Sequence, residues 1–252
     1  MESLTGWKVA GASVQGTSHI GTGMPCQDAH AHRVLSDTLV VVLADGAGSA
    51  PHSREGAQRA VAVACDGLSG TLARALPLSA VKWRQLMGRV FARARAGVAA
   101  RAGAASLSAW ATTLTCVVAT PRQLVVGQLG DGLVAAADQD GALFAAVPPQ
   151  RGQYANETLF LTGPNALEQI DVQIYPRSVK ALVATTDGLL RLATSPGYEP
   201  HAPFFAPLTR FVGQANSTAR ASGRLAAFLR SARVCDRTDD DKTLVVAVRR
   251  EP

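Results

Sequence analysis

The sequence has few aromatic residues, no paired cysteines and no long apolar run. Aromatic side chains make up 5% of the 252 residues, too few to build a stacking surface for single-stranded nucleic acid. No Cys-x-x-Cys pair occurs, so we expect reduced, mostly buried thiols and no structural zinc. These cysteines are Cys26, Cys65, Cys116 and Cys235. No apolar run approaches the roughly 18 residues that cross a bilayer, and residues 1–7 lack the basic and apolar pattern of a secretory signal. The expectation is a soluble, cytoplasmic protein with no membrane partner.

Charge is modest in amount and biased toward arginine. Hydrophobic residues make up 47% and charged residues 17%, with a formal net charge of +6, which is typical of a globular chain. A cluster of arginines lies at Arg84, Arg89, Arg93, Arg95 and Arg101. We interpret it as the solvated face of a helix, with a docking surface for an acidic or phosphorylated partner as the second interpretation. A nucleic-acid binder is the third, and its affinity would fall steeply with salt.

Hydrophobic periodicity divides the chain into strands and helices. Short β-branched or apolar runs predict strands at Trp7–Val14, Leu39–Ala44, Thr112–Ala119, Leu124–Leu129, Leu133–Ala137, Lys180–Thr185 and Leu244–Val248. Helical spacing is present at Ala57, Ala60, Val61, Ala64 and Leu68, at Trp83, Met87, Val90 and Ala94, and at Leu225, Phe228 and Leu229. Pro77 separates the first two helices, because proline lacks the donor that a helix interior needs.

This order of elements predicts an α+β fold with helices packed on sheets. The spacing of the runs from Thr112 to Val147 favours antiparallel pairing. Two stretches, 148–152 and 195–207, are predicted to be irregular because they are rich in proline. Strand patterns resume after each of them, and the sequence contains no internal repeat. We therefore expect one domain over residues 1–252.

Aspartate recurs next to the predicted strands. Asp45, Asp131 and Asp187 are each followed by glycine and come directly after apolar runs, Asp240 precedes the last strand, and Asp28 lies in a polar turn. A single Asp-Gly pair is a common turn, but repetition at several strand ends is more specific. Two carboxylates about 5 Å apart would repel by roughly 3 kcal/mol at an effective dielectric near 20. Oxygen-only ligands of this kind select magnesium or manganese, so the pattern predicts a metal site.

At these residues the sequence resembles the metal-dependent protein phosphatases of type 2C, in particular a bacterial-style branch. The matching segments occur in the family's order and span nearly the whole chain. They are Pro25-Cys26-Gln27-Asp28-Ala29, Ala44-Asp45-Gly46-Ala47-Gly48-Ser49, Ala111-Thr112-Thr113-Leu114, Gly130-Asp131-Gly132, Thr186-Asp187-Gly188-Leu189 and Asp240-Asp241-Lys242-Thr243, with a further segment of that branch at 152–158.

The resemblance implies an α-β-β-α sandwich of two antiparallel sheets flanked by helices, with Mn²⁺ or Mg²⁺ at one end. It implies two ions and a third, weaker one. In such a site, Asp45 bridges the two metals, the Gly46 carbonyl binds the first, and Asp187 and Asp240 hold the second. Asp28 reaches the site directly or through water, and Asp131 helps to hold the third ion. Asp241 stands where many members carry asparagine, and it is expected to support the ligands.

The sequence departs from the family pattern at two positions. Gly23 stands where many members carry the arginine that grips the substrate phosphate, and Ala47 stands where some carry a histidine that serves as a general acid. His19 and Arg33 are the candidates to replace the missing arginine. Asn156 and Glu157 are expected to shape access for the substrate.

The implied activity is hydrolysis of phosphoserine or phosphothreonine on a protein by metal-activated water, through Asp28, Asp45, Asp187 and Asp240. The sequence has no Gly-x-Ser-x-Gly or Cys-x5-Arg motif, so a covalent route lacks support. The implied partners are a phosphoprotein and a cognate serine/threonine kinase.

Two alternatives to this activity remain open. One is a phosphatase-like module that binds a phosphoprotein or a kinase without turnover, which the missing arginine favours. The other is a zinc site at His30 and His32, two residues apart on a strand, although a surface location is the simpler interpretation. His52 and His201 are expected to be solvated.

Overall fold

The computed structural model describes residues 6–150 and 158–250. Ten strands form two five-stranded sheets in this part of the chain, and every pair of neighbouring strands is antiparallel. The first sheet has the order β1-β10-β9-β6-β7, and the second has the order β2-β3-β4-β5-β8. The strands are β1 (Trp7–Val14), β2 (Ala29–Leu35), β3 (Thr38–Ala44), β4 (Leu114–Ala119), β5 (Leu124–Leu129), β6 (Leu133–Asp138), β7 (Leu143–Val147), β8 (Asp171–Tyr175), β9 (Val179–Thr185) and β10 (Lys242–Arg249).

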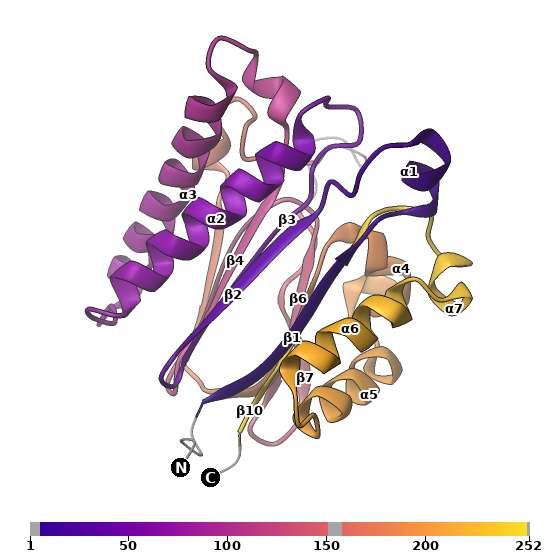
Figure 1. Cartoon of the computed structure of the whole chain (residues 1–252). Coiled ribbons are helices and arrows are strands. Elements are labelled where there is room, and N and C mark those ends of the chain that lie inside the picture. The colour runs from indigo at the N-terminus through magenta and orange to yellow at the C-terminus, as the bar shows by residue number, and fades with distance from the viewer. Residues whose placement is uncertain (1–5, 151–157, 251–252) are drawn as a thin grey trace.

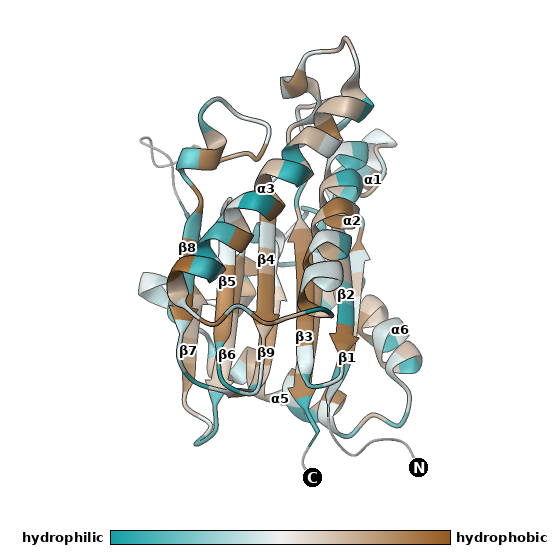
Figure 2. Ribbon diagram, turned by 90° about the vertical axis from the view of Figure 1, so that its left-hand side faces the viewer, coloured by the Kyte–Doolittle hydropathy of each residue, from teal (hydrophilic) through white to brown (hydrophobic). Residues whose placement is uncertain are grey.

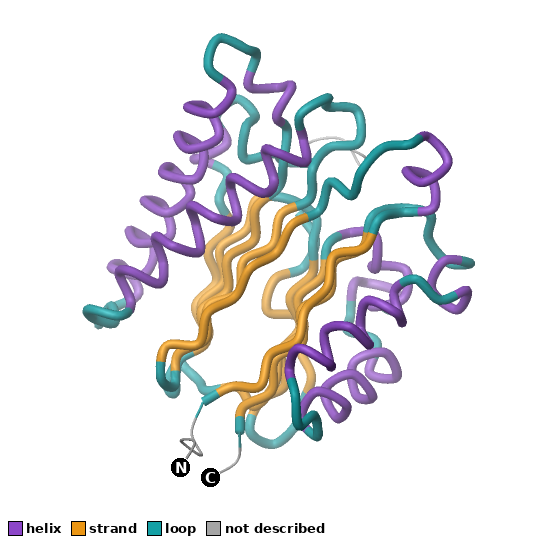
Figure 3. The backbone as a smooth tube through the Cα atoms, in the orientation of Figure 1, coloured by secondary structure: helices purple, strands orange, loops and turns teal. Residues whose placement is uncertain are grey.

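Helices cover the outer face of each sheet, which gives four layers (Figures 1 and 3). The helices are α1 (Thr17–Thr22), α2 (Ser53–Leu72), α3 (Ala80–Ala102), α4 (Leu190–Ala193), α5 (Ala202–Gly213), α6 (Thr218–Leu229) and α7 (Ala232–Cys235). The pair α2 and α3 lies on the β2–β8 sheet, and α5 and α6 lie on the β1–β7 sheet. The α-β-β-α sandwich that the sequence implied is confirmed. No helix among the described residues is both long enough and apolar enough to span a bilayer.

Apolar side chains form a core in each of the three interfaces between layers. Strand β3 shows how one strand serves two of them: Val40 and Val42 pack toward α2 and α3, whereas Leu39 and Val41 face the opposite sheet. Successive side chains of a strand point to opposite faces, so a strand covered on both sides is apolar throughout. The central strands are accordingly the most hydrophobic part of the ribbon in Figure 2.

The helices that the sequence predicted are present. The apolar positions predicted for α2 and α3 are all buried, and Pro77 lies in the loop between them. Leu225 and Leu229 of α6 are buried and Phe228 is half-buried. In the arginine cluster of α3, Arg95 is half-buried. It donates hydrogen bonds to the carbonyls of Leu161 and Gly163, 2.6 and 2.8 Å away.

The expectation of an irregular stretch over 195–207 is wrong in its second half, because α5 begins at Ala202. Pro203 lies in the first turn of α5, where a helix needs no N–H donor, and Pro207 lies inside the helix. The helix is held on the sheet by Phe205, Leu208 and Val212, which are buried. The free energy gained by burying this face outweighs the low helix propensity of a segment with two prolines.

Candidate metal centre

The acidic residues meet where loops of both sheets gather at one end of the sandwich. Antiparallel pairing aligns Ala29 with Ala44, so Asp28 and Asp45 flank the last pair of β2 and β3. In the other sheet, Thr185 pairs with both Leu133 and Leu244. The residues just outside these pairs include Asp131 before β6, Asp187 after β9 and Asp240 before β10. Strand register therefore aligns two aspartates in one sheet and three in the other, and packing of the two sheets brings all five to one end.

Three of the carboxylates converge closely. One carboxylate oxygen each of Asp45, Asp131 and Asp187 lies within 4.8 Å of the others, and this is the only group of three or more potential His, Cys, Asp or Glu ligands within the described residues. All three side chains are partly buried. Like charges this close repel unless protons or cations compensate them, and an all-oxygen donor set suits Mg²⁺ or Mn²⁺.

Burial and mutual repulsion shift these carboxyl groups toward the protonated form. Burial, followed by the negative charges of Asp131 and Asp240, raises the pKa of Asp187 to about 6. Burial also raises the pKa of Asp131. The pKa of Asp45 lies well above its usual value, first because of burial and then because of the charge of Asp28. A cluster that resists ionisation without a cation is the expected environment of a divalent metal.

Asp28 lies beside this group, almost completely buried. Its Oδ2 atom accepts a hydrogen bond of 2.8 Å from the Thr186 hydroxyl, while Oδ1 is buried with no partner among the described residues. Burial raises the pKa of Asp28 to about 7, against the effect of the hydrogen bond from Thr186. A buried acceptor without a donor is costly, and a cation or a metal-held water would satisfy it. The residues present therefore fit a metal site.

Backbone contacts hold Asp45 and Gly46 in place. The Thr113 hydroxyl accepts a 2.8 Å hydrogen bond from the Asp45 N–H, and the Thr113 N–H donates to the Asp45 carbonyl, also at 2.8 Å. A side chain at Gly46 would lie 2.8 Å from the carbonyl carbon and oxygen of Ser53 and 2.9 Å from the Gln27 carbonyl oxygen. Only glycine fits this close approach. The sequence singled out the Thr112-Thr113 segment as a family match, and the structure shows its physical role.

Asp241 lies outside the cluster and contacts the segment around Gly16 and His19 and the loop at Gln27. Its carboxylate is 3% exposed and accepts hydrogen bonds of 2.6 Å from the N–H groups of Gly16 and Gln27. Its Oδ1 atom also lies 3.0 Å from Nδ1 of His19. Because Gln27 directly precedes Asp28, Asp241 fixes the loop that presents Asp28. This matches the supporting role expected for Asp241.

Two threonines of the matching segments support the carboxylates, although no role was predicted for either. Thr186 donates a hydrogen bond to Asp28, and Thr158 donates a 2.8 Å hydrogen bond to Oδ2 of Asp131. Lys242 is fully buried, and its Nζ atom donates to the Asp240 carbonyl at 2.9 Å. The Asp240 side chain itself is exposed. Its charge nevertheless lies close enough to raise the pKa of Asp187.

The two candidates for replacing the missing arginine differ in position. Arg33 pairs with Val40, four residues along β2 from Ala29, or about 13 Å at the rise of a strand. Its guanidinium lies 3.9 Å from Asp66, so Arg33 does not reach the site. His19 is at the correct end but is held by Asp241. Gly23, with φ of 72°, ends α1 in the left-handed conformation that favours glycine.

The histidines do not build a zinc site. His30 and His32 are half-buried rather than on the open surface, and Nδ1 of His30 lies 2.8 Å from the Ser13 hydroxyl. Burial lowers the pKa of His30 to about 4. His52 and His201 are exposed, as expected, although His52 also stacks on Trp110 with ring centroids 5.1 Å apart. Asn156 and Glu157 lie outside the described residues.

The four cysteines are free thiols. Cys65 and Cys116 are buried, whereas Cys26 and Cys235 are half-buried, so burial is less complete than the sequence suggested.

Comparison with known proteins agrees with this geometry. The sequence model of the family described as protein phosphatase 2C matches residues 15–230. The chain is 34% identical over 263 residues to the Escherichia coli (strain K12) protein named serine/threonine-protein phosphatase 3, and the match covers 96% of this chain and 98% of the relative.

Solved structures with low sequence identity share the fold. The catalytic domain of the serine threonine protein phosphatase PstP, in complex with 2 manganese ions, aligns with a TM-score of 0.63 at 16% identity over 98% of this chain and 99% of that one. Stp1 from Staphylococcus aureus aligns with a TM-score of 0.60 at 14% identity, over 96% and 94% of the two chains. Together, the family match and the full-length relative show that the chain belongs to the protein phosphatase 2C family.

Proposed function

We propose that this chain is a metal-dependent protein phosphatase that hydrolyses phosphoserine and phosphothreonine on other proteins. The observation that carries the proposal is the convergence of Asp45, Asp131 and Asp187 within 4.8 Å in a member of the protein phosphatase 2C family. The Escherichia coli relative is named as a serine/threonine-protein phosphatase. Two structural neighbours are solved with manganese and with magnesium, which supports the use of a divalent cation.

The proposed ligands are the side chains of Asp28, Asp45, Asp131, Asp187 and Asp240 and the carbonyl oxygen of Gly46. We propose two Mn²⁺ or Mg²⁺ ions, with a third held more weakly through Asp131 and Asp187. When bound, such ions neutralise charge on the phosphoryl oxygens and lower the pKa of water toward neutrality. Support for this set comes from the raised pKa values of Asp45, Asp131 and Asp187.

The chain's own residues supply position and charge. Thr113 fixes Asp45, Thr186 orients Asp28, and Asp241 anchors the loop before Asp28. For the substrate phosphate we propose Arg54, an exposed residue in the first turn of α2, just after the Asp45-Gly46 loop. Its positive charge lies close enough to Cys26, two residues before Asp28, to oppose the rise in the pKa of that thiol. An Arg54→Ala variant should raise KM for p-nitrophenyl phosphate with a smaller effect on kcat.

We also propose that residues 1–252 form a single catalytic domain. The two sheets share an apolar interface, and each sheet has its own helical cover, so neither half could bury its core alone. The proposed partners are phosphoprotein substrates and a cognate serine/threonine kinase that phosphorylates them. A nucleic-acid role has little support, because Arg84 and Arg95 of α3 donate to backbone carbonyls of the same chain.

Hydrolysis of p-nitrophenyl phosphate, with and without Mn²⁺, tests this function. We expect metal-dependent activity in the wild type, its loss in Asp45→Asn and Asp187→Asn, and its retention in Asp140→Asn, a matched change at an exposed turn. Calorimetric titration with Mn²⁺ separates the enzyme from the inactive module. A wild type that binds metal but releases no phosphate from p-nitrophenyl phosphate or from a phosphopeptide would contradict the enzyme and favour the module.

A further inference from the structure

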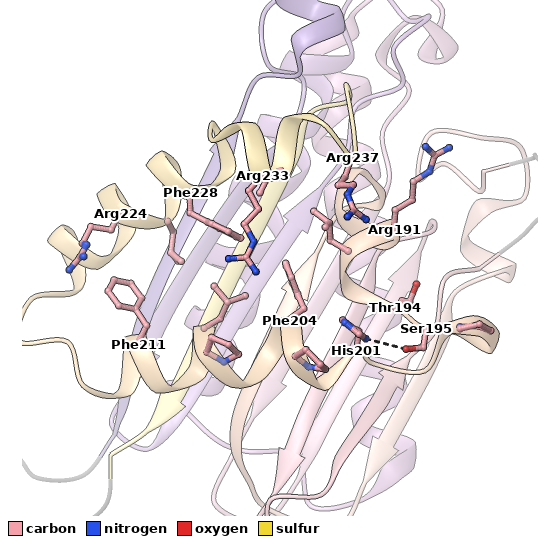
Figure 4. Close-up of a pocket in the computed structure, with 17 residues that line it drawn as sticks. Arg191, Thr194, Ser195, His201, Phe204, Phe211, Arg224, Phe228, Arg233 and Arg237 are labelled. Atoms are coloured by element: carbon pink, nitrogen blue, oxygen red, sulfur yellow. Dashed lines mark hydrogen bonds between the residues drawn. The ribbon is translucent and has the colours of Figure 1, made fainter.

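A second concave site lies on the outer face of the β1–β7 sheet, among α4, α5, α6 and α7 (Figure 4). We call it the arginine-rimmed pocket; it has a volume of about 770 Å³. None of the six proposed metal-ligand residues lines it. It is therefore distinct from the metal centre, and the proposed phosphatase chemistry does not explain it.

The floor of the pocket is apolar and incompletely covered. Phe204, Phe211 and Phe228 line it and are only half-buried, while Leu208 and Leu225 beneath them are buried. Figure 4 shows the phenylalanines of α5 and α6 facing the space between the two helices. Aromatic side chains gain most when they are fully removed from water, so this floor is suited to receive an apolar side chain of a ligand.

The rim of the pocket carries four arginines. They are Arg191, Arg224, Arg233 and Arg237, and all four are exposed. Within residues 6–150 and 158–250, none of the four guanidinium groups makes a hydrogen bond or an ion pair. The guanidinium carbon of Arg224 lies over the Phe211 ring, 5.3 Å from its centroid.

No carboxylate of the described residues lines the pocket. The site thus gathers positive charge without an internal counter-ion. Guanidinium groups bind carboxylates through paired hydrogen bonds, so an anionic ligand complements the rim while an apolar group complements the floor.

The shape of the site favours a protein segment over a lipid surface. The phenylalanines lie in a recess between helices, whereas insertion into a bilayer needs apolar side chains that protrude. The volume is within the range of sites that enclose a ligand. Recessed aromatic residues beside arginines are also the composition that dominates binding energy in protein interfaces.

We propose that the arginine-rimmed pocket is a docking site for an acidic segment of another protein. An aromatic or aliphatic side chain of that segment occupies the floor at Phe204, Phe211 and Phe228, and its carboxylates pair with the arginines of the rim. This inference does not depend on the proposed phosphatase activity.

The docking site is joined to the metal centre through the chain itself. Helix α4, which carries Arg191, begins three residues after Asp187, and Arg237 lies three residues before Asp240. A segment bound in the pocket therefore holds its protein against the elements that lead into two of the acidic loops.

Fluorescence anisotropy with the full chain tests the docking site directly. The probe is a fluorescein-labelled peptide in which Asp and Glu alternate with Leu and Phe, and the control peptide has Lys at each acidic position. We expect micromolar binding of the acidic peptide that weakens as salt is raised, and at least ten-fold weaker binding of the Lys peptide.

Variants then locate the binding. The double change Arg224→Glu and Arg233→Glu should weaken binding of the acidic peptide at least ten-fold, or about 1.4 kcal/mol. The control is the double change Arg89→Glu and Arg93→Glu, which alters the net charge equally on the exposed face of α3 in the opposite layer and should leave the affinity unchanged. Thermal melting of each variant checks that it is folded.

Three results would overturn the docking site. They are no binding of the acidic peptide at millimolar concentration, equal binding to the folded Arg224→Glu/Arg233→Glu variant, and binding to phosphatidylglycerol vesicles without binding to the peptide. None of these measurements requires turnover, so they remain informative even if the chain hydrolyses no phosphate.

Discussion

The carboxylate cluster should make the metal-free protein less stable as the pH rises, and Asp187→Asn should remove part of this loss. The pKa of Asp187 is raised from 3.8 to about 6 in the folded protein. A carboxyl group whose pKa is higher in the folded state stabilises that state fully below its unfolded pKa, and this contribution is lost as the pH rises through the folded value. The relevant window is therefore between about pH 4 and pH 7.

The size of the effect follows from the shift. One pKa unit corresponds to about 1.36 kcal/mol, so ionised Asp187 costs the metal-free fold at most about 3 kcal/mol above pH 7. Asparagine keeps the shape of the side chain and carries no charge. About half of this cost is already present at pH 5, because the unfolded pKa lies near 4. Relative to wild type, Asp187→Asn should therefore gain about 1.4 kcal/mol between pH 5 and pH 8, or roughly 3–6 °C in melting temperature for a domain of this size.

Urea unfolding in EDTA at pH 5 and pH 8 measures this difference, with Asp140→Asn at an exposed turn as the control. Mn²⁺ at 1,000 times its Kd for the wild type should reverse the order at pH 8, because a ligand that binds only the folded state then stabilises it by about 4.1 kcal/mol, and the variant lacks one ligand. The reasoning would be refuted if Asp187→Asn changed stability equally at both pH values, or if Mn²⁺ stabilised the two proteins equally.

Three further changes probe the supports of the site. Asp241→Asn can accept from only one of the Gly16 and Gln27 N–H groups, so thermal unfolding should show a loss of about 1.5–3 kcal/mol, and an unchanged melting temperature would contradict this. Thr186→Val removes the hydrogen bond that lowers the pKa of Asp28, so calorimetry at pH 7 should show weaker Mn²⁺ binding. Thr209→Val, at a half-buried position of α5, should have no effect. Gly188→Ala places a methyl group against the Asp241 carbonyl oxygen, which should separate Asp187 from the β10 loop and weaken Mn²⁺ binding at least ten-fold; wild-type affinity in this variant would show that the two loops move freely.

Local pattern predicted the parts of the fold whose side chains are buried on a regular period. The long runs of β3, β5 and β9 and the helical spacing of α2 and α3 carry their signal in consecutive residues, because both faces or one continuous stripe must be apolar. The strands β2, β7 and β8 were not among the predicted strands. All three are edge strands. Most residues of β2 and β8 and the first three of β7 are at least partly exposed, and their pairing partners hold these strands in place. Helix α5 was missed for a related reason, since its prolines conceal a face that the sheet buries.

The sequence by itself determined that aspartates follow the ends of several apolar strands, and the ordered motifs indicated the family. It also indicated that oxygen ligands would select a hard divalent cation. Only the tertiary structure decided which carboxylates meet, because Asp45, Asp131 and Asp187 come together through the register of strands from two different sheets. It likewise decided that Arg33 lies too far along β2 to help, and that arginines from three separate helical segments rim one pocket. Contacts between residues far apart in the chain leave no pattern in the local sequence. They depend on how whole layers of helices and strands pack together, and neighbouring residues do not encode that arrangement.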